Sequence, residues 1–199
     1  MRKIGIFSGS FDPVHNGHLA FAHQAINRCQ LDRVYFLPEP RPRRKQGVKA
    51  FEHRVAMLEL AIKNQSKLGL IILKQARFNV TETLPKLTAR FKNDSLYMLV
   101  GEDVLMSMIN WPHVKELASA VHFIIGVRTT SKVDLAKHIS VIEKTRGLNF
   151  SYTIFAADDS TANSSVVRSK LRHGQTPDTI DKKVQNYITR HKLYYSVAE

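Results

Sequence analysis

The chain of 199 residues is long enough for one domain with a well-developed hydrophobic core and short for two. Hydrophobic residues (43%) and charged residues (24%) occur in globular proportions, and no apolar run approaches the roughly 18 residues that a membrane span needs. The single cysteine, Cys29, excludes an internal disulfide, and the N-terminus resembles a first strand more than an export signal. We therefore expect a cytoplasmic protein with no membrane partner.

The formal net charge of +13 leaves two classes of partner open, which are nucleic acid and a small, highly phosphorylated ligand. The densest basic cluster comprises Arg41, Arg43, Arg44, Lys45 and Lys49. Aromatic residues do not interleave with these bases, as they do on a stacking platform for single-stranded nucleic acid. We therefore expect no nucleic-acid partner.

Short β-rich runs alternate along the chain with longer helical patterns. In chain order, the patterns predict strand Lys3–Phe7, helix Gly17–Arg28, strand Arg33–Leu37, helix Phe51–Lys63, strand Leu70–Leu73, helix Val80–Phe91, strand Leu96–Val100, helix Trp111–Ala118, strand Val121–Val127, strand Tyr152–Ala156, helix Ser165–Arg172 and helix Asp181–His191. Pro112 suits the first turn of its helix. The polar stretch Thr129–Gly147 fits either a helical insertion or a mobile surface segment.

This alternation predicts an α/β protein, with residues 1–199 forming a single Rossmann-like, doubly wound parallel sheet covered by helices on both faces. In such sheets, ligands bind beyond the carboxyl ends of the strands. The segments expected at those ends are Gly9–His18, Pro38–Lys45, Gly101–Asp103 and Arg128.

The first strand leads into S-G-S-F-D-P-V-H-N-G-H and then a helix. Gly9 permits a tight turn, and the N-terminus of a helix binds anions through its backbone N–H groups. His15 and His18 can each donate a hydrogen bond to a phosphate oxygen, and Gly17 between them leaves room for it. A plain turn with two incidental histidines is the simpler alternative. A zinc site is a third, but no cysteine or carboxylate completes a tetrahedral set at a recognisable spacing.

The H-x-G-H pattern after a first strand is the signature of the nucleotidyltransferase α/β-phosphodiesterase superfamily. The local form G-S-F-D-P-V-H-N-G-H resembles the nicotinate/nicotinamide mononucleotide adenylyltransferases. This resemblance implies that His15 and His18 are catalytic residues. It also implies ATP contacts by Gly9, Ser10, Phe11, His15, Gly17 and His18.

Later segments resemble the same family in register, so that the resemblance covers essentially the whole chain. Val34–Lys45 is similar to its phosphate-binding loop that ends in a lysine, and Asn163–Arg168 is similar to its I-S-S-T-x-I-R motif. The further ATP-binding residues that the resemblance implies are Gly101, Asp103, Ser164, Ser165 and Arg168. The substrate-binding residues that it implies are Lys45, Arg54, Thr83, Trp111 and Arg128, with the tryptophan stacked on a pyridine ring. The helical part from about residue 160 to 199 would complete the ATP site.

Each of these later residues also has an ordinary structural explanation. Lys45, Arg54 and Arg128 fit a basic surface, and Trp111 fits a hydrophobic core. Asp103 and the two serines at 164 and 165 fit helix caps.

One segment departs from the family pattern in a way that affects the choice of substrate. Bacterial nicotinate enzymes typically carry S-Y-T-x-D-T, whereas Phe78–Thr83 reads F-N-V-T-E-T and keeps only Thr83 and an acidic residue, Glu82. Since that segment helps the family to distinguish a nicotinate carboxylate from a nicotinamide amide, the preferred pyridine stays open.

The reaction implied by the resemblance is adenylyl transfer in NAD biosynthesis, in which the phosphate of the mononucleotide attacks the α-phosphorus of ATP and pyrophosphate leaves. Such chemistry depends on positioning and on stabilising spreading negative charge. Mg²⁺ would be the cofactor, held mainly by ATP and water with no protein ligand. Another adenylyl- or cytidylyltransferase with an H-x-G-H motif is the nearest alternative, and a non-enzymatic nucleic-acid binder is a more distant one. A homo-oligomer is compatible with the sequence.

Overall fold

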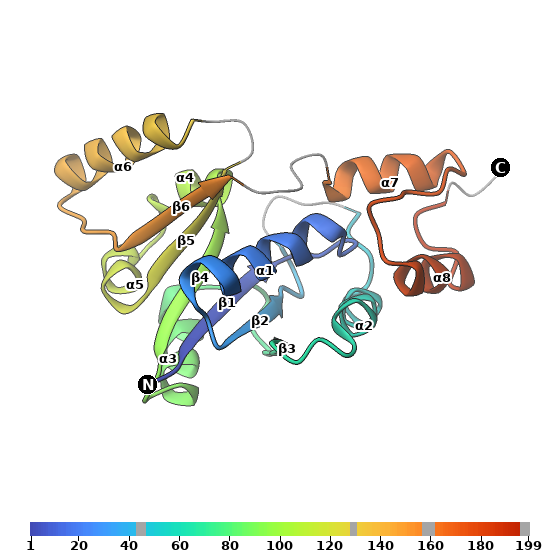
Figure 1. Ribbon diagram of the computed structural model, residues 1–199, viewed down its shortest axis with the longest axis horizontal. Coiled ribbons are helices and arrows are strands. Elements are labelled where there is room, and N and C mark those ends of the chain that lie inside the picture. Colours follow the sequence, from blue (N-terminus) through green and yellow to red (C-terminus); the bar gives the residue numbers. More distant parts are fainter. Residues whose placement is uncertain (43–46, 128–130, 157–161, 196–199) are drawn as a thin grey trace.

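The structure is a computed structural model that describes residues 1–42, 47–127, 131–156 and 162–195 (Figure 1). The strands are β1 (Lys3–Gly9), β2 (Arg33–Pro38), β3 (Leu68–Leu70), β4 (Ser95–Gly101), β5 (His122–Val127) and β6 (Tyr152–Ala156). The helices are α1 (Asn16–Cys29), α2 (Phe51–Ile62), α3 (Val80–Arg90), α4 (Glu102–Met108), α5 (Val114–Ala120), α6 (Lys132–Arg146), α7 (Ser164–Arg172) and α8 (Lys182–Arg190). Among the helices of this described part, none is long and apolar enough to cross a membrane.

The strands form one parallel sheet in the order β3-β2-β1-β4-β5-β6. The chain builds outward from β1 in one direction as far as β3, then returns to the other side of β1 as β4. This reversal places a topological switch point between β1 and β4, where ligands bind in open α/β sheets. The predicted Rossmann-like, doubly wound parallel sheet is confirmed.

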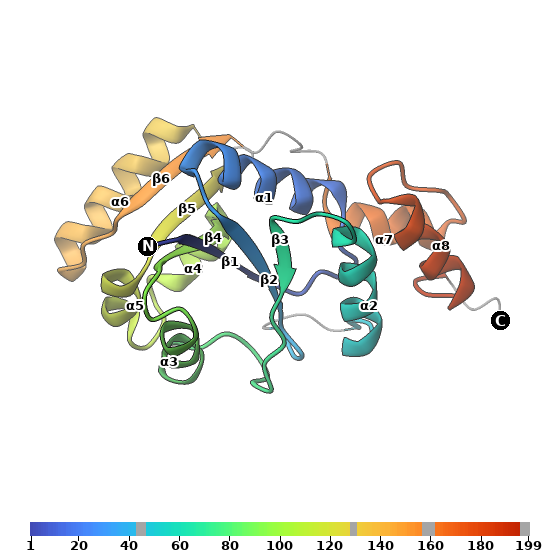
Figure 2. The same cartoon turned by 60° about the horizontal axis from the view of Figure 1, so that its bottom comes forward.

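Both faces of the sheet are buried because side chains alternate between two hydrophobic cores. In β4, Met98 and Val100 face one core and Leu99 faces the other, and in β5 the side chain of Ile124 joins that of Leu99. Helices α3, α4, α5 and α6 cover the first face, while α1 and α2 cover the second (Figure 2). Burying each large apolar side chain contributes about 1.5–3 kcal/mol, so hydrophobic burial is the main force holding both helical layers to the sheet.

The C-terminal helices extend the second core beyond the edge of the sheet. Val167 and Leu171 of α7 and Val184 and Ile188 of α8 are buried in the same cluster as Met57 of α2. Figure 1 shows α7 and α8 beside α2, at the end of the molecule farthest from α6. The C-terminal segment therefore packs next to the first loop of the chain, which follows β1.

Two predicted elements were wrong at their boundaries. The predicted strand Leu70–Leu73 is β3 at Leu68–Leu70, because pairing with β2 ends there and Ile72 is already 54% exposed. The predicted helix Trp111–Ala118 begins only at Val114, because His113 adopts a left-handed backbone (φ 62°) that breaks the helix.

The polar stretch after β5 contains a true helix, α6. The Ser131 side chain caps it by accepting from the backbone N–H groups of Val133 and Asp134, at 3.2 and 3.4 Å. Gly147 ends it in the left-handed conformation (φ 59°) that glycine adopts without strain. The helical interpretation of Thr129–Gly147 is therefore confirmed for Lys132–Arg146. A short helix, α4, was not predicted.

Candidate active site

The candidate site lies at the carboxyl ends of β1, β2 and β4, around the loop that joins β1 to α1. His15 is the N-cap of α1, and its ring stacks on that of His18 with 3.7 Å between centroids. The backbone N–H of His15 donates to Nδ1 of His18 at 3.2 Å. A ring nitrogen that accepts a hydrogen bond carries no proton, so this contact assigns the proton of neutral His18 to Nε2. His18 therefore has a donor nitrogen suited to a phosphate oxygen.

The buried ring of Phe11 packs against this histidine pair. Its backbone is left-handed (φ 47°), and its buried ring meets the ring of His18 edge-on at 5.0 Å. A Cβ at Gly9 would come within 3.2 Å of the Phe11 ring, so any larger residue there would press on that ring. The structure places the Phe11 side chain in the core, where it positions His18, and not on the open side of the loop.

Gly17 lies where another segment approaches α1. A Cβ atom at this position would stand 3.1 Å from both the Cβ of Ala162 and Nδ1 of His15. The N–H of Asn16 donates to the carbonyl of Thr179 at 2.8 Å, so one N–H at the start of α1 is engaged by the connection between α7 and α8. The start of α1 is thus enclosed by the C-terminal part of the chain.

Helix α7 brings the second predicted phosphate motif onto the same loop. Asn163 is its N-cap and accepts from Val166 N–H at 2.8 Å, so the serines at 164 and 165 belong to its first turn. Ser164 Oγ donates to the carbonyl of Pro13 at 3.0 Å. Arg168 donates from Nη2 to Ser165 Oγ at 3.1 Å. These residues, far in sequence from the loop before His15, therefore lie against that loop in space.

Arg54 is only 1% exposed, and its guanidinium binds backbone carbonyls. Nε donates to Lys49, Nη1 to Ser10 and Glu39, and Nη2 to Pro40, all at 2.7–2.9 Å. Burial lowers the pKa of Arg54, which neighbouring acidic groups, Asp12 foremost, partly offset, and arginine remains charged at neutral pH.

This placement assigns Arg54 a structural contribution. Its contacts tie both ends of the segment between Pro40 and Lys49 to the loop before His15. The segment contains Lys45, which lies outside the described residues, as do Arg43 and Arg44. Arg128, at the end of β5, lies outside them too.

The residues expected to bind the pyridine also meet in space. The half-buried ring of Trp111 lies 6.2 Å from that of Phe78, measured between centroids, with the planes tilted by 34°. Thr83 is buried, and its Oγ1 accepts from Asn79 N–H at 3.1 Å in the first turn of α3. A small pocket at the end of β2 is lined by Leu37, Pro38, Glu39, Leu73, Gln75, Arg77, Phe78 and Thr83.

Gly101 and Asp103 lie at the end of β4. The exposed Asp103 side chain folds back, so that a Cβ at Gly101 would stand 2.8 Å from its Oδ1. Gly101 is the N-cap of α4. A side chain at Gly101 would therefore displace that of Asp103.

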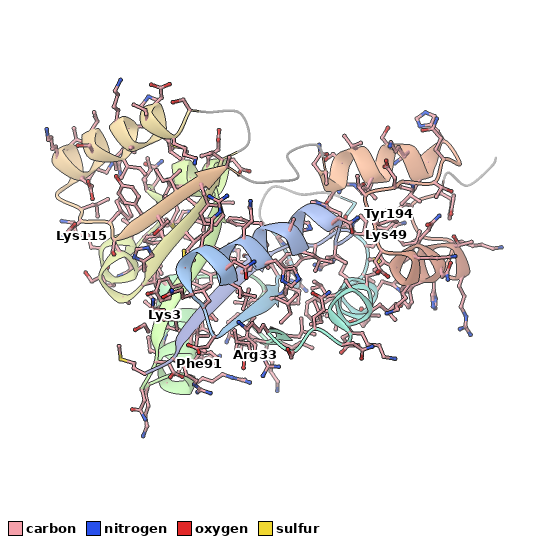
Figure 3. The ribbon with its side chains drawn as sticks, viewed as in Figure 1. Lys3, Arg33, Lys49, Phe91, Lys115 and Tyr194 are labelled. Carbon is pink, nitrogen blue, oxygen red and sulfur yellow. The ribbon has the colours of Figure 1, made fainter. Side chains whose placement is uncertain are left out.

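Three polar residues that organise the site were not among the predicted site residues: Asp12, Glu39 and Tyr194. Glu39 Oε1 accepts from Ser8 Oγ at 3.1 Å and from Phe78 N–H at 3.2 Å, which joins β1 to the segment before α3. Figure 3 shows Tyr194 next to Lys49, whose Nζ stands 5.6 Å from the centre of the tyrosine ring. A carboxylate inside a phosphate-binding loop repels the phosphates unless a donor or cation pairs with it. The presence of Asp12 in this loop was therefore the one sequence feature that indicated a partner for it.

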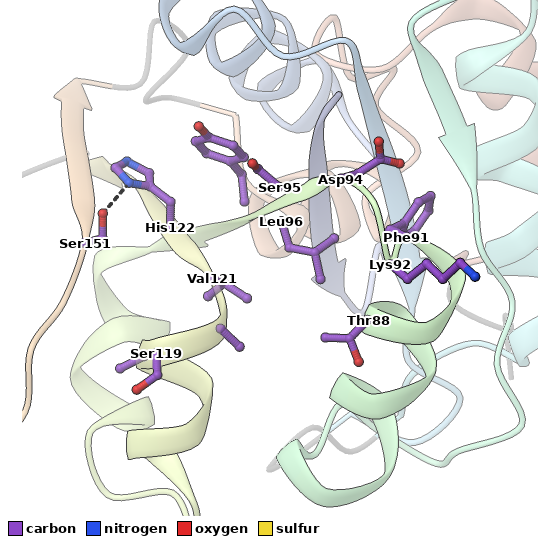
Figure 4. Close-up of a pocket in the computed structure, with 13 residues that line it drawn as sticks. Thr88, Phe91, Lys92, Asp94, Ser95, Leu96, Ser119, Val121, His122 and Ser151 are labelled. Atoms are coloured by element: carbon purple, nitrogen blue, oxygen red, sulfur yellow. Dashed lines mark hydrogen bonds between the residues drawn. The ribbon is translucent and has the colours of Figure 1, made fainter. Parts of the chain in front are cut away.

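A second hollow, of about 470 Å³, lies at the opposite edge of the sheet, near the starts of β4 and β5 (Figure 4). Two of its polar side chains already have partners. His122 contacts Ser151 Oγ at 2.7 Å, and Asp94 pairs with Arg2 at 2.8 Å. Burial lowers the pKa of His122 and so favours its neutral form. Its lining residues include nothing like the stacked histidines or the serine and arginine of α7 at the carboxyl edge of the sheet.

Comparisons with known proteins were made on sequence and on structure. Residues 6–170 match the cytidylyltransferase-like family. The nicotinate-nucleotide adenylyltransferase of Bacillus subtilis is 30% identical, over 98% of this chain and 100% of that protein. A probable nicotinate-nucleotide adenylyltransferase of Solibacter usitatus is 32% identical, over 96% of this chain and 99% of the other.

Among solved structures, the fold is similar to that of Plasmodium falciparum nicotinic acid mononucleotide adenylyltransferase complexed with NaAD. The TM-score is 0.79, with 20% sequence identity over 98% of both chains. The same protein complexed with APC gives a TM-score of 0.77 at 19% identity over 98% of both chains. At this level of identity the likeness concerns the fold.

Proposed function

Because the chain belongs to the cytidylyltransferase-like family, and within it to the nicotinate-nucleotide adenylyltransferases, we propose that it joins ATP to nicotinate mononucleotide and releases pyrophosphate. The observation that carries the proposal is the meeting of two phosphate motifs at one place. His15 and His18 stack at the start of α1, and Ser164 in the first turn of α7 donates to the carbonyl of Pro13, two residues before His15. We propose nicotinate over nicotinamide on the basis of the two relatives, both of which are named as nicotinate-nucleotide adenylyltransferases.

On this proposal, the histidine pair stabilises the charge that spreads over the α-phosphoryl group during transfer. His18 donates from Nε2, the nitrogen that the hydrogen bond at Nδ1 leaves protonated. Ser164, Ser165 and Arg168 hold the β- and γ-phosphates from the opposite side. Lys45 holds the phosphate of the mononucleotide, which attacks in line.

Magnesium fits as an ion carried by ATP. We propose that its ligands are mainly ATP phosphates and water, the usual set for magnesium bound with a nucleotide. When bound, the ion neutralises polyphosphate charge and favours departure of pyrophosphate.

The pyridine ring would stack on Trp111, next to Phe78. Phe78 and Thr83 line the small pocket at the end of β2, and Trp111 packs beside Phe78. Both rings belong to the core on one face of the sheet, whereas α7 packs in the core on the other face. An aromatic face suits a flat pyridine ring, and stacked aromatic pairs contribute about 0.5–1.5 kcal/mol beyond their burial.

The test offers nicotinate mononucleotide and nicotinamide mononucleotide separately to the protein with ATP and Mg²⁺, and measures pyrophosphate and dinucleotide. We expect dinucleotide from nicotinate mononucleotide and much less from its amide. Absence of product from both would refute the proposed substrate. Pyrophosphate release with a different phosphorylated acceptor, such as phosphopantetheine, would support the neighbouring adenylyltransferase activity. Cytoplasmic location and homo-oligomerisation stay predictions.

A further inference from the structure

Asp12 is a buried carboxylate inside the loop that is proposed to hold ATP. It is 3% exposed and lies three residues before His15. Its Oδ1 accepts from the hydroxyl of Tyr194 at 2.6 Å and from the backbone N–H of Lys49 at 3.2 Å. A buried negative charge next to bound phosphates would repel them unless donors neutralise it, so these contacts are needed for the loop to bind an anion.

Tyr194 is held firmly in its place. It is 4% exposed, and its ring packs in the same core as Phe11 and Val14 of the loop. Burial first, and then the Asp12 carboxylate, raises the pKa of Tyr194 above its ordinary range. The phenol therefore stays protonated and donates to Asp12 at all physiological pH values.

Arg168 closes the arrangement from α7. Its Nη1 donates to the backbone carbonyl of Asp12 at 2.7 Å and lies 3.8 Å from the carboxylate Oδ2. The side chain of Arg168 remains one-quarter exposed, so part of it stays accessible to a ligand while it holds the loop. Asp12 thus joins the histidine loop to α7 and to the C-terminal tail.

We propose that Asp12 and Tyr194 form a positioning pair that fixes the histidine loop and Arg168 in the geometry that binds ATP. The inference rests on the proposed function and adds the C-terminal tail to the ATP half of the site, although neither residue touches the reacting atoms. Removing the Tyr194 hydroxyl leaves the carboxylate underpaired. Asp12 then competes with ATP for Arg168 and repels the phosphates, while the mononucleotide side is unaffected.

The alternative is that the hydrogen bond only holds the C-terminal segment in place. A second tyrosine provides the matched control, because Tyr187 on α8 bonds to Nδ1 of His53 on α2 at 2.9 Å. That contact also ties the C-terminal segment to the body of the protein through a tyrosine hydroxyl. It does not touch the histidine loop.

The experiment compares Tyr194→Phe, Tyr187→Phe and Asp12→Asn with the wild-type chain. For each, steady-state kinetics are measured for ATP and for nicotinate mononucleotide, together with calorimetric binding of a non-hydrolysable ATP analogue and the melting temperature. We expect Tyr194→Phe to lower kcat/KM for ATP and to weaken analogue binding on the order of tenfold, the size expected for a hydrogen bond to a charged group. KM for the mononucleotide should stay within about twofold in Tyr194→Phe, since an interaction confined to the ATP side leaves the other site intact. Tyr187→Phe should change only the melting temperature.

Asp12→Asn keeps an acceptor oxygen for Tyr194 and Lys49, so we expect it to retain more ATP affinity than Tyr194→Phe. If both tyrosine variants lost the same amount of melting temperature and bound ATP as the wild type does, the proposed positioning role would be wrong. The Tyr194 hydrogen bond would then only hold the C-terminal segment in place. If the wild-type chain turned over neither mononucleotide, the proposed function would fail, and analogue binding would still decide the role of the pair.

Discussion

The N–H of His15 donates to Nδ1 of His18, and the two imidazoles stack 3.7 Å apart. A backbone group of one histidine thereby sets the tautomer of the other, before any ligand binds. Electrostatic catalysis depends on donors that are oriented in advance, because no energy is then spent on turning them during the reaction.

Replacing His18 with alanine should therefore lower kcat by about 10²- to 10³-fold, the usual effect of removing one oriented donor to a developing charge. The melting temperature should fall only modestly, because the ring also accepts from the N-cap N–H of α1 and packs on Phe11, and losing a helix cap costs about 0.5–2 kcal/mol. His23 provides the control, since it lies exposed on the same helix and contacts Gln65. Near-normal turnover in His18→Ala would contradict the proposed role.

Arg54 should matter for stability more than for substrate affinity. Replacing it with alanine leaves the carbonyls of Lys49, Ser10, Glu39 and Pro40 without their donor, and we expect a loss on the order of 3 kcal/mol in the free energy of unfolding. Arg54→Lys should be intermediate, because an ammonium group cannot serve all of these directions. Urea denaturation measures the effect. Unchanged stability together with a raised KM for the mononucleotide would favour direct substrate binding.

Lys45→Ala should weaken binding of the mononucleotide more than binding of ATP, since the lysine is proposed to hold the mononucleotide phosphate. Isothermal titrations with each ligand separately provide the measurement. Lys63→Ala, which removes an exposed lysine just after α2, controls for the loss of one positive charge. A larger effect on ATP than on the mononucleotide would count against the assignment.

Trp111 is the only tryptophan of the chain, so tryptophan emission reports on this residue alone. Stacking of a pyridine ring should quench that emission when nicotinate mononucleotide is added. An ATP analogue alone should cause a much smaller change. Saturation with the mononucleotide without any change in emission would argue that Trp111 serves only the core.

Stability at alkaline pH should depend on Tyr194. Because its pKa is raised in the folded chain, the unfolded chain loses this proton first, from about pH 10 upward. The contribution of the buried phenol is therefore complete below that pH and is lost as the pH rises further. Wild-type protein should lose stability more steeply than Tyr194→Phe above pH 10. The same slope in both would contradict the raised pKa.

The strand and helix patterns were predictable because they depend on local periodicity. The short, nearly continuous apolar runs of β4 and β5, and the glycine that ends α6, carry that information within a few residues of the chain. The boundary of β3 was not predictable, since its end depends on pairing with β2. Likewise, the left-handed backbone at His113 that delays α5 has no signal in the residue type alone.

By itself, the sequence determined the α/β class, the doubly wound sheet and the loop with His15 and His18, because periodicity and a contiguous motif are local properties. Only the tertiary structure decided that Arg54 points inward and that Tyr194 reaches Asp12 across 182 positions of the chain. A charged or phenolic side chain carries no local mark of its direction. That direction depends on which backbone carbonyls and carboxylates the packed sheet and helices bring within hydrogen-bonding reach.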